Sequence, residues 1–333
     1  MKIKKFSFED NRWDEFCYES DDCWFFHTSD FTKYVLEYSG KDDVELLSFY
    51  IEDKNNDILA ICPLIRYKNN LTFFGHNAPN PAIRNGLSFQ LSNDLMNQIF
   101  SEINRIAQQL NIEKNIMTLT PLSKNVLNLF TYNYLMKYGY ENTSLNTQIL
   151  VLDKDERILW SEIKKSHRYE INKGEEMFEF LFLKPFETNR ALFDEFKNLH
   201  FLAAGMKTRS DLTWDYQFEW ISKGNGLLVL AVLDGKPIGG IYSLLYKDGA
   251  YYAVSANHPD YDELSISHAI QWQIIKYLKV NRFKYYELGL QQFSNQPYDT
   301  PTEKDINISL FKRHFGGYTV TFHRGQKTFK SKI

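Results

Sequence analysis

The chain has 333 residues, of which 43% are hydrophobic, and it includes 26 Phe and 21 Tyr. This length and composition are sufficient for two ordinary domains, each with a large packed core. The formal net charge is -3, which excludes a general electrostatic attraction to nucleic acid or anionic lipid but is compatible with a local basic patch.

Three cysteines, Cys17, Cys23 and Cys62, form neither a Cys-x-x-Cys pair nor an even framework, which favours a reducing compartment. The opening residues, MKIKKFSFEDNRW, contain no apolar run of the kind found in a secretory signal. No stretch approaches the roughly 18 apolar residues of a membrane span. We therefore expect a cytoplasmic protein without a membrane span.

The first half of the chain is predicted to begin with two helices and a meander, followed by alternating helices and strands. The expected helices cover residues 11–18, 29–38, 95–110 and 122–136, and the expected strands cover 44–51, 58–67, 71–74, 115–119 and 147–152.

The second half contains the clearest pattern, three apolar runs at 227–233, 238–246 and 250–256. The dipeptides Asp234-Gly235 and Asp248-Gly249 separate them, and Asp-Gly between apolar runs predicts a tight turn, so the runs form an antiparallel meander. A helix at 265–280 and a strand at 283–290 complete this unit. Before it we expect a basic segment at 158–176, a strand at 178–183, a helix at 189–202 and a polar, aromatic segment at 203–221; a helix at 307–319 that stops at the Gly-Gly pair follows.

The order of elements in the second half repeats that of the first, although no repeat of residues is visible. Meander, helix and strand in this order resemble the central part of the GNAT-type N-acyltransferase fold. We therefore predict an α/β protein with mixed sheets and two tandem GNAT-like domains, residues 1–153 and 154–333.

Short motifs extend the resemblance to a family. Several lie in the second half: Trp160 followed by Lys-Lys-Ser-His-Arg and Ile-Asn-Lys, Thr208-Arg209, Tyr286-Glu287-Leu288-Gly289, and Phe311-Lys312 ahead of Phe315-Gly316-Gly317. Phe26-His27-Thr28 and Cys62-Pro63-Leu64 add to these in the first half. Together they resemble the FemAB family of peptidoglycan-bridge aminoacyltransferases and their relatives, which consist of two GNAT-like halves.

This resemblance implies transfer of an acyl or aminoacyl group to an amine or hydroxyl of a cell-envelope or surface-glycan precursor, such as a nucleotide-linked amino sugar. The alternatives are an aminoacyl-tRNA-dependent peptidoglycan-bridge ligase and a non-catalytic GNAT-like module that binds glycan. The expected partner is a small-molecule or glycan-precursor substrate that carries phosphate, and the acidic balance disfavours tRNA.

Two departures from the family pattern leave the acyl donor open between acyl-CoA and aminoacyl-tRNA, with no cofactor expected to be bound. GNAT enzymes that use acetyl-CoA hold its pyrophosphate on a glycine-containing loop before the central helix, whereas residues 256–261 contain no glycine. The long helical hairpin of tRNA-using members is also missing from the pattern. No zinc-ligand spacing and no P-loop are present, so we expect no metal.

The catalytic candidates are Glu287, His268 and Tyr252. Acyl transfer to an amine requires a proton acceptor and stabilisation of an oxyanion. Glu287, on the closing strand, is the candidate base, and a salt-bridged strand carboxylate is the alternative. His268 can bind substrate or act as a base because its unperturbed pKa is about 6.5; a structural histidine is the alternative. Tyr252 is a candidate hydroxyl donor.

The candidate substrate-binding residues are mostly basic or amide side chains. A cluster suited to a diphosphate follows Trp160, since Arg can hold phosphate oxygens with two parallel N–H groups; the alternative is a solvated helix face. Arg209 is a second candidate anchor. The full set is Lys164, Lys165, His167, Arg168, Lys173, Arg209, Trp214, Gln217 and Gln271.

Overall fold

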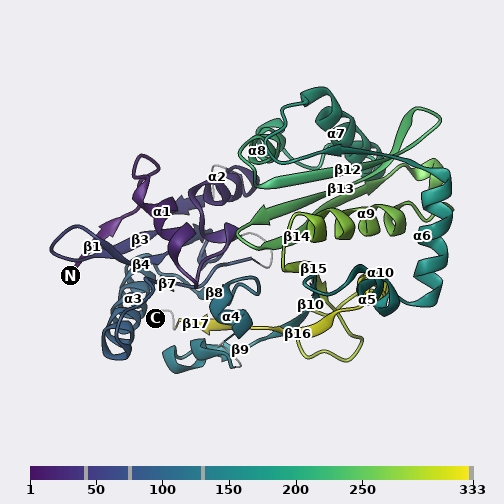
Figure 1. Ribbon diagram of the computed structural model, residues 1–333. Helices are drawn as coiled ribbons and strands as arrows, with labels where there is room; N and C mark the ends of the chain where they lie inside the picture. Colours follow the sequence, from purple (N-terminus) through teal and green to yellow (C-terminus); the bar gives the residue numbers. More distant parts are fainter. Residues whose placement is uncertain (41–43, 74–76, 129–131, 330–333) are drawn as a thin grey trace. The chain divides into compact units, whose positions relative to one another are not determined.

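The computed structural model describes residues 1–333 apart from 41–43, 74–76, 129–131 and 330–333 (Figure 1). It contains mixed sheets and helices, as predicted, and divides into two compact units. Met1–Leu145 and Thr321–Ile333 form the first unit, and Asn146–Val320 form the second.

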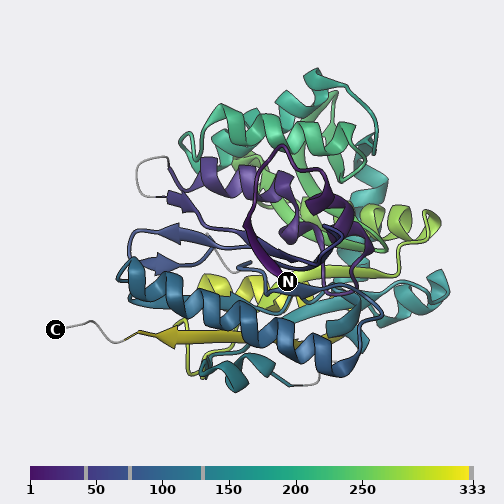
Figure 2. The ribbon, with the colours of Figure 1, turned by 90° about the vertical axis from the view of Figure 1, so that its left-hand side faces the viewer.

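This division differs at two places from the expected division at residue 153. Strand β10 (Leu145–Val151) pairs with a strand of the second unit, β15 (Tyr285–Gln291). Strand β17 (Arg324–Thr328) pairs with β8 (Lys114–Thr118) of the first unit, and Figure 2 shows this yellow strand among the blue elements. Both differences come from long-range pairing, which local hydrophobic patterns do not encode.

The first unit contains two sheets. The first is ordered β1 (Lys2–Lys5), β3 (Phe49–Glu52), β4 (Ile58–Cys62), β7 (Ala82–Ile83); the second is ordered β2 (Val44–Leu46), β5 (Ile65–Tyr67), β6 (Asn70–Leu71), β8, β17, β9 (Glu141–Asn142). The predicted hairpin of 44–51 with 58–67 therefore exists, but each of its strands is broken midway and contributes to both sheets. Pro63 lies at the break in the second strand, where a missing N–H interrupts a ladder.

Helices surround these sheets: α1 (Arg12–Glu19), η1 (Phe25–His27), α2 (Ser29–Tyr38), α3 (Phe89–Gln109), α4 (Lys124–Asn128) and η2 (Tyr134–Tyr138). Helix α2 has the predicted ends, and the Thr28 side chain caps it by accepting from the N–H of Phe31. The single helix expected at 122–136 is wrong. The described residues there form only α4 and η2, and Asn133, with ψ of 92°, interrupts any continuous helix.

The second unit contains one sheet, ordered β11 (Glu179–Leu183), β12 (Gly226–Leu233), β13 (Lys236–Tyr246), β14 (Gly249–Asn257), β15, β10, β16 (Tyr318–Phe322). Strands β12, β13 and β14 form the predicted antiparallel meander. Strand β15 runs parallel to β14, which requires a crossover, and the predicted helix α9 (Ile266–Val280) supplies it.

The other helices of this unit are α5 (Glu156–Glu162), α6 (Lys165–Met177), α7 (Arg190–Ala204), α8 (Asp211–Ser222), η3 (Pro259–Tyr261) and α10 (Glu303–Arg313). Adjacent glycines on β13 show how α7 and α9 are placed. A Cβ at Gly239 would contact Ile266 of α9, and one at Gly240 would contact Phe196 of α7. Since neighbouring strand residues face opposite ways, α7 and α9 cover opposite faces (Figure 1). Among the described residues, no helix is both long and apolar enough to cross a membrane.

Candidate active site of the second unit

Strands β14 and β15 separate after a short stretch of pairing. Their parallel register, among the residues that the structure describes, covers only Gly249–Tyr251 against Tyr285–Glu287. Strand β14 nevertheless continues to Asn257 and β15 to Gln291. Beyond Glu287 the two strands therefore leave each other, and a bulge in β14 before Val254 increases its bend.

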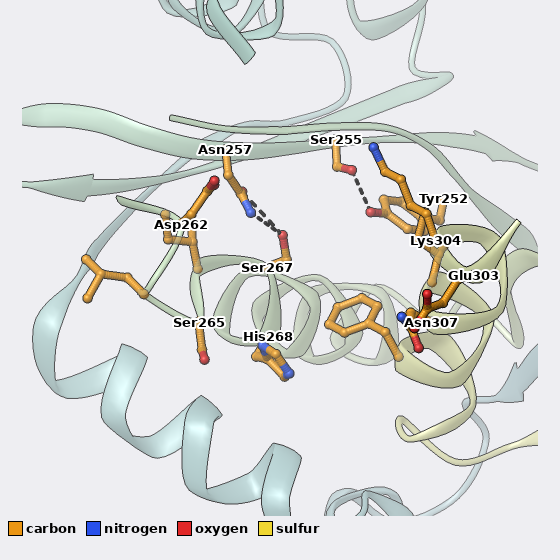
Figure 3. Close-up of a pocket in the computed structure, with 14 residues that line it drawn as sticks. Tyr252, Ser255, Asn257, Asp262, Ser265, Ser267, His268, Glu303, Lys304 and Asn307 are labelled. Atoms are coloured by element: carbon orange, nitrogen blue, oxygen red, sulfur yellow. Dashed lines mark hydrogen bonds between the residues drawn. The ribbon is translucent and has the colours of Figure 1, made fainter. Parts of the chain in front are cut away.

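A cavity of about 690 Å³ lies where β14 leads into α9. Figure 3 shows Asn257, Ser265 and Asp262 toward one end of it and Tyr252, Glu303 and Lys304 toward the other. The side chains on its wall hold each other in place: Tyr252 Oη donates to Ser255 Oγ at 2.7 Å, and the Asn257 amide bonds to Ser267 Oγ at 2.9 Å. The polar side chains of the wall are therefore positioned by hydrogen bonds within the protein.

Asn257, in the glycine-free loop expected from the sequence, lines this cavity, and so does Asp262 directly after that loop. Pro259–Tyr261 is a short 3-10 helix, and His258 caps it by accepting from the N–H of Asp260. The cavity is also lined by two exposed carboxylates, Asp262 and Glu303, against a single lysine, Lys304. Carboxylates repel phosphate, so these residues do not fit the usual seat of the CoA pyrophosphate.

Glu287 is buried beside this region, with 4% of its surface exposed. Its Oε1 accepts from Thr147 Oγ1 at 2.7 Å, while its buried Oε2 has no hydrogen-bond partner among the described residues. Burial raises the pKa of Glu287 to about 7, although the Thr147 hydrogen bond and the charge of Lys312 both lower it. A carboxyl with a pKa near neutrality is suited to accept and release a proton.

Lys312, near the end of α10, is the charged group opposite Glu287. Burial lowers its pKa to about 8, and the Glu287 charge works against this shift. Its ammonium makes no hydrogen bond or ion pair with the part of the chain that the structure describes. Lys312 Nζ lies 5.8 Å from the centroid of the Tyr252 ring, and Tyr252 lines the cavity. Tyr252 therefore connects the cavity with the Glu287–Lys312 pair.

Three histidines meet where α6, α9 and α10 pack together. The centroid of the His167 ring lies 4.3 Å from that of His268 and 4.8 Å from that of His314, and His167 Nε2 lies 3.2 Å from the Phe311 carbonyl oxygen. Burial and the neighbouring imidazoles lower the pKa of His167 to about 3, and burial also lowers that of His268. We call His167, His268 and His314 the histidine junction; its rings are neutral at pH 7 and pack on one another.

The predicted basic residues of α6 lie at its surface. Lys164 is exposed, and its Nζ lies 3.2 Å from His314 Nε2. Lys165 and Lys173 are exposed, and Arg168 is partly buried. Of the residues in this predicted cluster, only His167 is buried. The other four side chains of this cluster are therefore accessible to a phosphate group from solvent.

A third set of predicted residues gathers at α8. Arg209 stacks on Trp214, with its guanidinium carbon 3.7 Å from the ring centroid, and its Nη2 donates to Gln217 Oε1 at 2.9 Å. Trp214 and Gln217 are buried. Gln271 lies elsewhere, on the buried face of α9, where its Oε1 accepts from Tyr286 Oη at 2.9 Å.

The predicted site residues thus fall into several groups. His268 and Tyr252 share the cavity wall, and His268 also joins the histidine junction. Glu287 has Lys312 and Thr147 as partners, neither of which was predicted as a site residue. The sequence offered a signal for Lys312, because this residue belongs to the Phe311-Lys312 motif. It offered no signal for Thr147, since the contact of Thr147 with Glu287 depends on strand pairing across 140 residues of chain.

Comparison with known proteins agrees with this geometry. Residues 161–299, which span the meander, α9 and β15, match the family described as acetyltransferase (GNAT) domain. The crystal structure of FemX is similar to the whole chain, with 11% sequence identity, a TM-score of 0.68, and coverage of 99% of this chain and 98% of FemX. This chain has a FemX-like tandem GNAT fold.

Two further structures support the tandem arrangement. The C-terminal domain of a putative lysylphosphatidylglycerol synthetase from Agrobacterium fabrum is 13% identical, with a TM-score of 0.59 and coverage of 95% of this chain and 90% of that one. A tandem GNAT protein from the clavulanic acid biosynthesis pathway is 8% identical, with a TM-score of 0.55 and coverage of 98% of both chains. No curated protein matches in sequence. The predicted resemblance and fold class are confirmed, and the chain carries a GNAT acyltransferase domain.

Proposed function

We propose that this tandem GNAT protein transfers an acyl or aminoacyl group to an amine of a cell-envelope or surface-glycan precursor, such as a nucleotide-linked amino sugar. One observation carries the proposal. Glu287 Oε2 has no hydrogen-bond partner among the described residues, and the oppositely charged Lys312 acts on it electrostatically without a hydrogen bond, at the point where β14 and β15 separate. Buried polar groups without partners are costly, so such a pair favours a ligand-binding role.

The two groups suit the two needs of acyl transfer. The acceptor nitrogen forms a bond to the donor carbonyl carbon, and its proton passes to Glu287 Oε2. Negative charge then develops on the carbonyl oxygen, where the Lys312 ammonium stabilises it. Collapse of this intermediate breaks the bond to the leaving group. The leaving group takes its proton from the protonated Glu287 through water, or from Tyr252 Oη, which then recovers a proton from Glu287; burial raises the pKa of Tyr252 and keeps its hydroxyl protonated before this step.

The cavity at α9 is the proposed seat of the donor, because Tyr252 belongs both to its wall and to the surroundings of Lys312. The carboxylates of this cavity disfavour the usual binding of the CoA pyrophosphate. Acyl-CoA and aminoacyl-tRNA are therefore both candidate donors to be tested. The acceptor phosphates are assigned to exposed or partly exposed basic residues, Lys164, Arg168 and Lys173 on α6 and Arg209 ahead of α8. We also propose a cytoplasmic location, because the three cysteines of the sequence form neither a Cys-x-x-Cys pair nor an even framework.

The test is intact-mass analysis of candidate acceptors. UDP-linked and CMP-linked amino sugars are incubated with the protein and with either acyl-CoA donors or charged tRNA. We expect a mass gain that disappears in Glu287→Gln and persists in Glu195→Gln, whose carboxylate is exposed on α7. A gain only with charged tRNA identifies an aminoacyl-tRNA ligase. Binding of the amino sugars without a gain in either arm would contradict the proposed enzyme and favour a glycan-binding module.

A further inference from the structure

We infer that Thr147 is a positioning residue for the reaction, which holds the Glu287 carboxyl so that Oε2 faces the acceptor amine. The inference rests on the proposed role of Glu287 as the base. Thr147 is fully buried, and its hydroxyl donates to Glu287 Oε1 at 2.7 Å. Thr147 belongs to β10, the first strand of the second unit, and not to the GNAT meander.

A bulge in β15 brings the two side chains together. Gln148 is opposite Gly289 and Ile149 is opposite Glu287, so Leu288 is an extra residue in β15. Alternation along β10 places Thr147 on the same face as Ile149, and therefore on the face of Glu287. Tyr286 and Leu288 lie in the core with α9, so Glu287 and Thr147 lie on the opposite face of the sheet.

Gly289 directly follows the extra residue of this bulge and also leaves room for the second charged group. Its φ is +85°, a conformation that glycine adopts at no steric cost. A Cβ at this position would lie 3.3 Å from Lys312 Nζ. The same residue therefore sets the register that aligns Thr147 with Glu287 and keeps the space into which Lys312 extends.

The hydrogen bond constrains a side chain that otherwise rotates freely. With Oε1 held by Thr147, rotation about the terminal bond of Glu287 is restricted, and Oε2 keeps one direction. The hydroxyl donates to the carboxylate form and favours it, so it also opposes the effect of burial on the Glu287 pKa. Loss of the hydroxyl should therefore change both the orientation and the proton affinity of the base.

The experiment compares Thr147→Val with Thr147→Ser. Valine keeps the branched shape and removes the donor, whereas serine keeps the donor. We expect Thr147→Val to lower kcat about 10-fold or more, as expected when a buried acceptor loses its partner, with KM within about twofold. The acidic limb of its kcat/KM profile should move to higher pH. Thr147→Ser should restore most of kcat and the wild-type limb. If Thr147→Val does not fold, Thr147→Cys serves instead, since a thiol is a weak donor.

A titration without substrate separates this inference from the proposed function. The Glu287 carboxyl is followed by carbon NMR in protein labelled at glutamate side chains, with Glu287→Gln to assign its signal. A higher Glu287 pKa in Thr147→Val, with serine close to wild type, is the expected result. An unchanged pKa, or equal losses of kcat in the valine and serine variants, would overturn the role of Thr147. If the pKa shifts as expected but Glu287→Gln turns over at the wild-type rate, the assignment of Glu287 as the base fails, and the positioning role fails with it.

Discussion

The second unit contains two groups of buried ionisable side chains that differ in how their polar atoms are used. In the histidine junction, His167 Nε2 meets the Phe311 carbonyl oxygen, and the rings pack on one another and on phenylalanines. In the other group, Glu287 and Lys312 retain polar atoms that no described residue satisfies. Packing within the protein accounts for the histidine junction. The Glu287–Lys312 pair retains hydrogen-bonding capacity that a ligand would use.

This difference teaches that a perturbed pKa alone does not mark an active site, because structural groups also show such shifts. His167 has the larger displacement from its ordinary pKa, yet its environment explains that displacement completely through burial and neighbouring rings. Glu287 and Lys312 combine displaced pKa values with open hydrogen-bonding capacity and a strand separation. The following predictions test this contrast, from the largest expected effect to the smallest.

Replacement of the base should have the largest effect. Glu287→Gln keeps the shape of the side chain and removes its ability to accept a proton, so kcat should fall by about 10²–10⁴, the range typical of general bases, with little change in KM. Steady-state kinetics on the acceptor identified by mass analysis measure this. Glu195→Gln, exposed on α7, is the matched control and should keep kcat within about twofold.

The same variant should gain stability, and the sign follows from the pKa. The folded pKa of Glu287 is about 7, above its ordinary value of 4.5, so the folded state holds a proton that the unfolded state releases between these values. Stability is therefore lost as pH rises from 4.5 through 7. Relative to wild type, the Tm of Glu287→Gln should rise more at pH 8 than at pH 5. A lower Tm at pH 8 would indicate a structural carboxylate.

Removal of the Lys312 ammonium should have the next largest effect on kcat. Lys312→Met keeps the length and apolar stem of the side chain but removes the charge, and kcat should fall by about 10²–10³, as when a single oxyanion donor is lost. Lys236→Met, exposed at the start of β13, serves as the control. If the two variants lose the same activity, the oxyanion role of Lys312 fails and a general effect of charge explains the result.

A plot of kcat/KM against pH should be a narrow, bell-shaped curve. Glu287 must lose its proton, which happens as pH rises through about 7, and Lys312 must keep its proton, which it loses as pH rises through about 8. The two limbs belong to the interacting pair rather than to either residue alone. In Lys312→Arg the alkaline limb should disappear, since arginine stays protonated. Retention of that limb would assign it to another group.

Changes in the histidine junction should affect stability more than turnover. The folded pKa of His167 is about 3, below its ordinary 6.5, so the unfolded state binds a proton that the folded state excludes. Stability should fall as pH drops from 6.5 toward 3, by at most about 1.4 kcal/mol per pH unit. Denaturant unfolding of His167→Phe should show a shallower acid slope, with kcat within about threefold. A loss of kcat comparable to that of Glu287→Gln would place the junction in the catalytic site.

The parts of this fold that could be predicted are those whose signals are local. Asp234-Gly235 and Asp248-Gly249 determined the meander, and the Thr28 cap with its apolar periodicity determined α2. The helix α8 was missed because its aromatic and polar residues show no clear apolar stripe. The broken strands of the first unit were read as continuous, since both halves of each are apolar.

The site was predictable only along single elements. Glu287 and Tyr252 were identified as candidates on strands and His268 on a helix. No local signal shows which of these side chains lie close together. The Thr147–Glu287 contact depends on a register set by the positive φ of Gly289. Lys312 lies in a recognised motif, but its proximity to Glu287 depends on how α10 packs.

The pairing of β17 with β8 has a consequence for how this protein is made. In the order of the first unit's second sheet, β17 lies between β8 and β9, so residues 324–328 fill an interior place. A ribosome completes the contiguous segment 146–320 before it supplies that strand. The GNAT domain can therefore fold during synthesis, while the first unit carries an exposed, unpaired strand edge until residues 324–328 have been synthesised. Premature termination after residue 320 would leave a nascent chain prone to aggregate through β8.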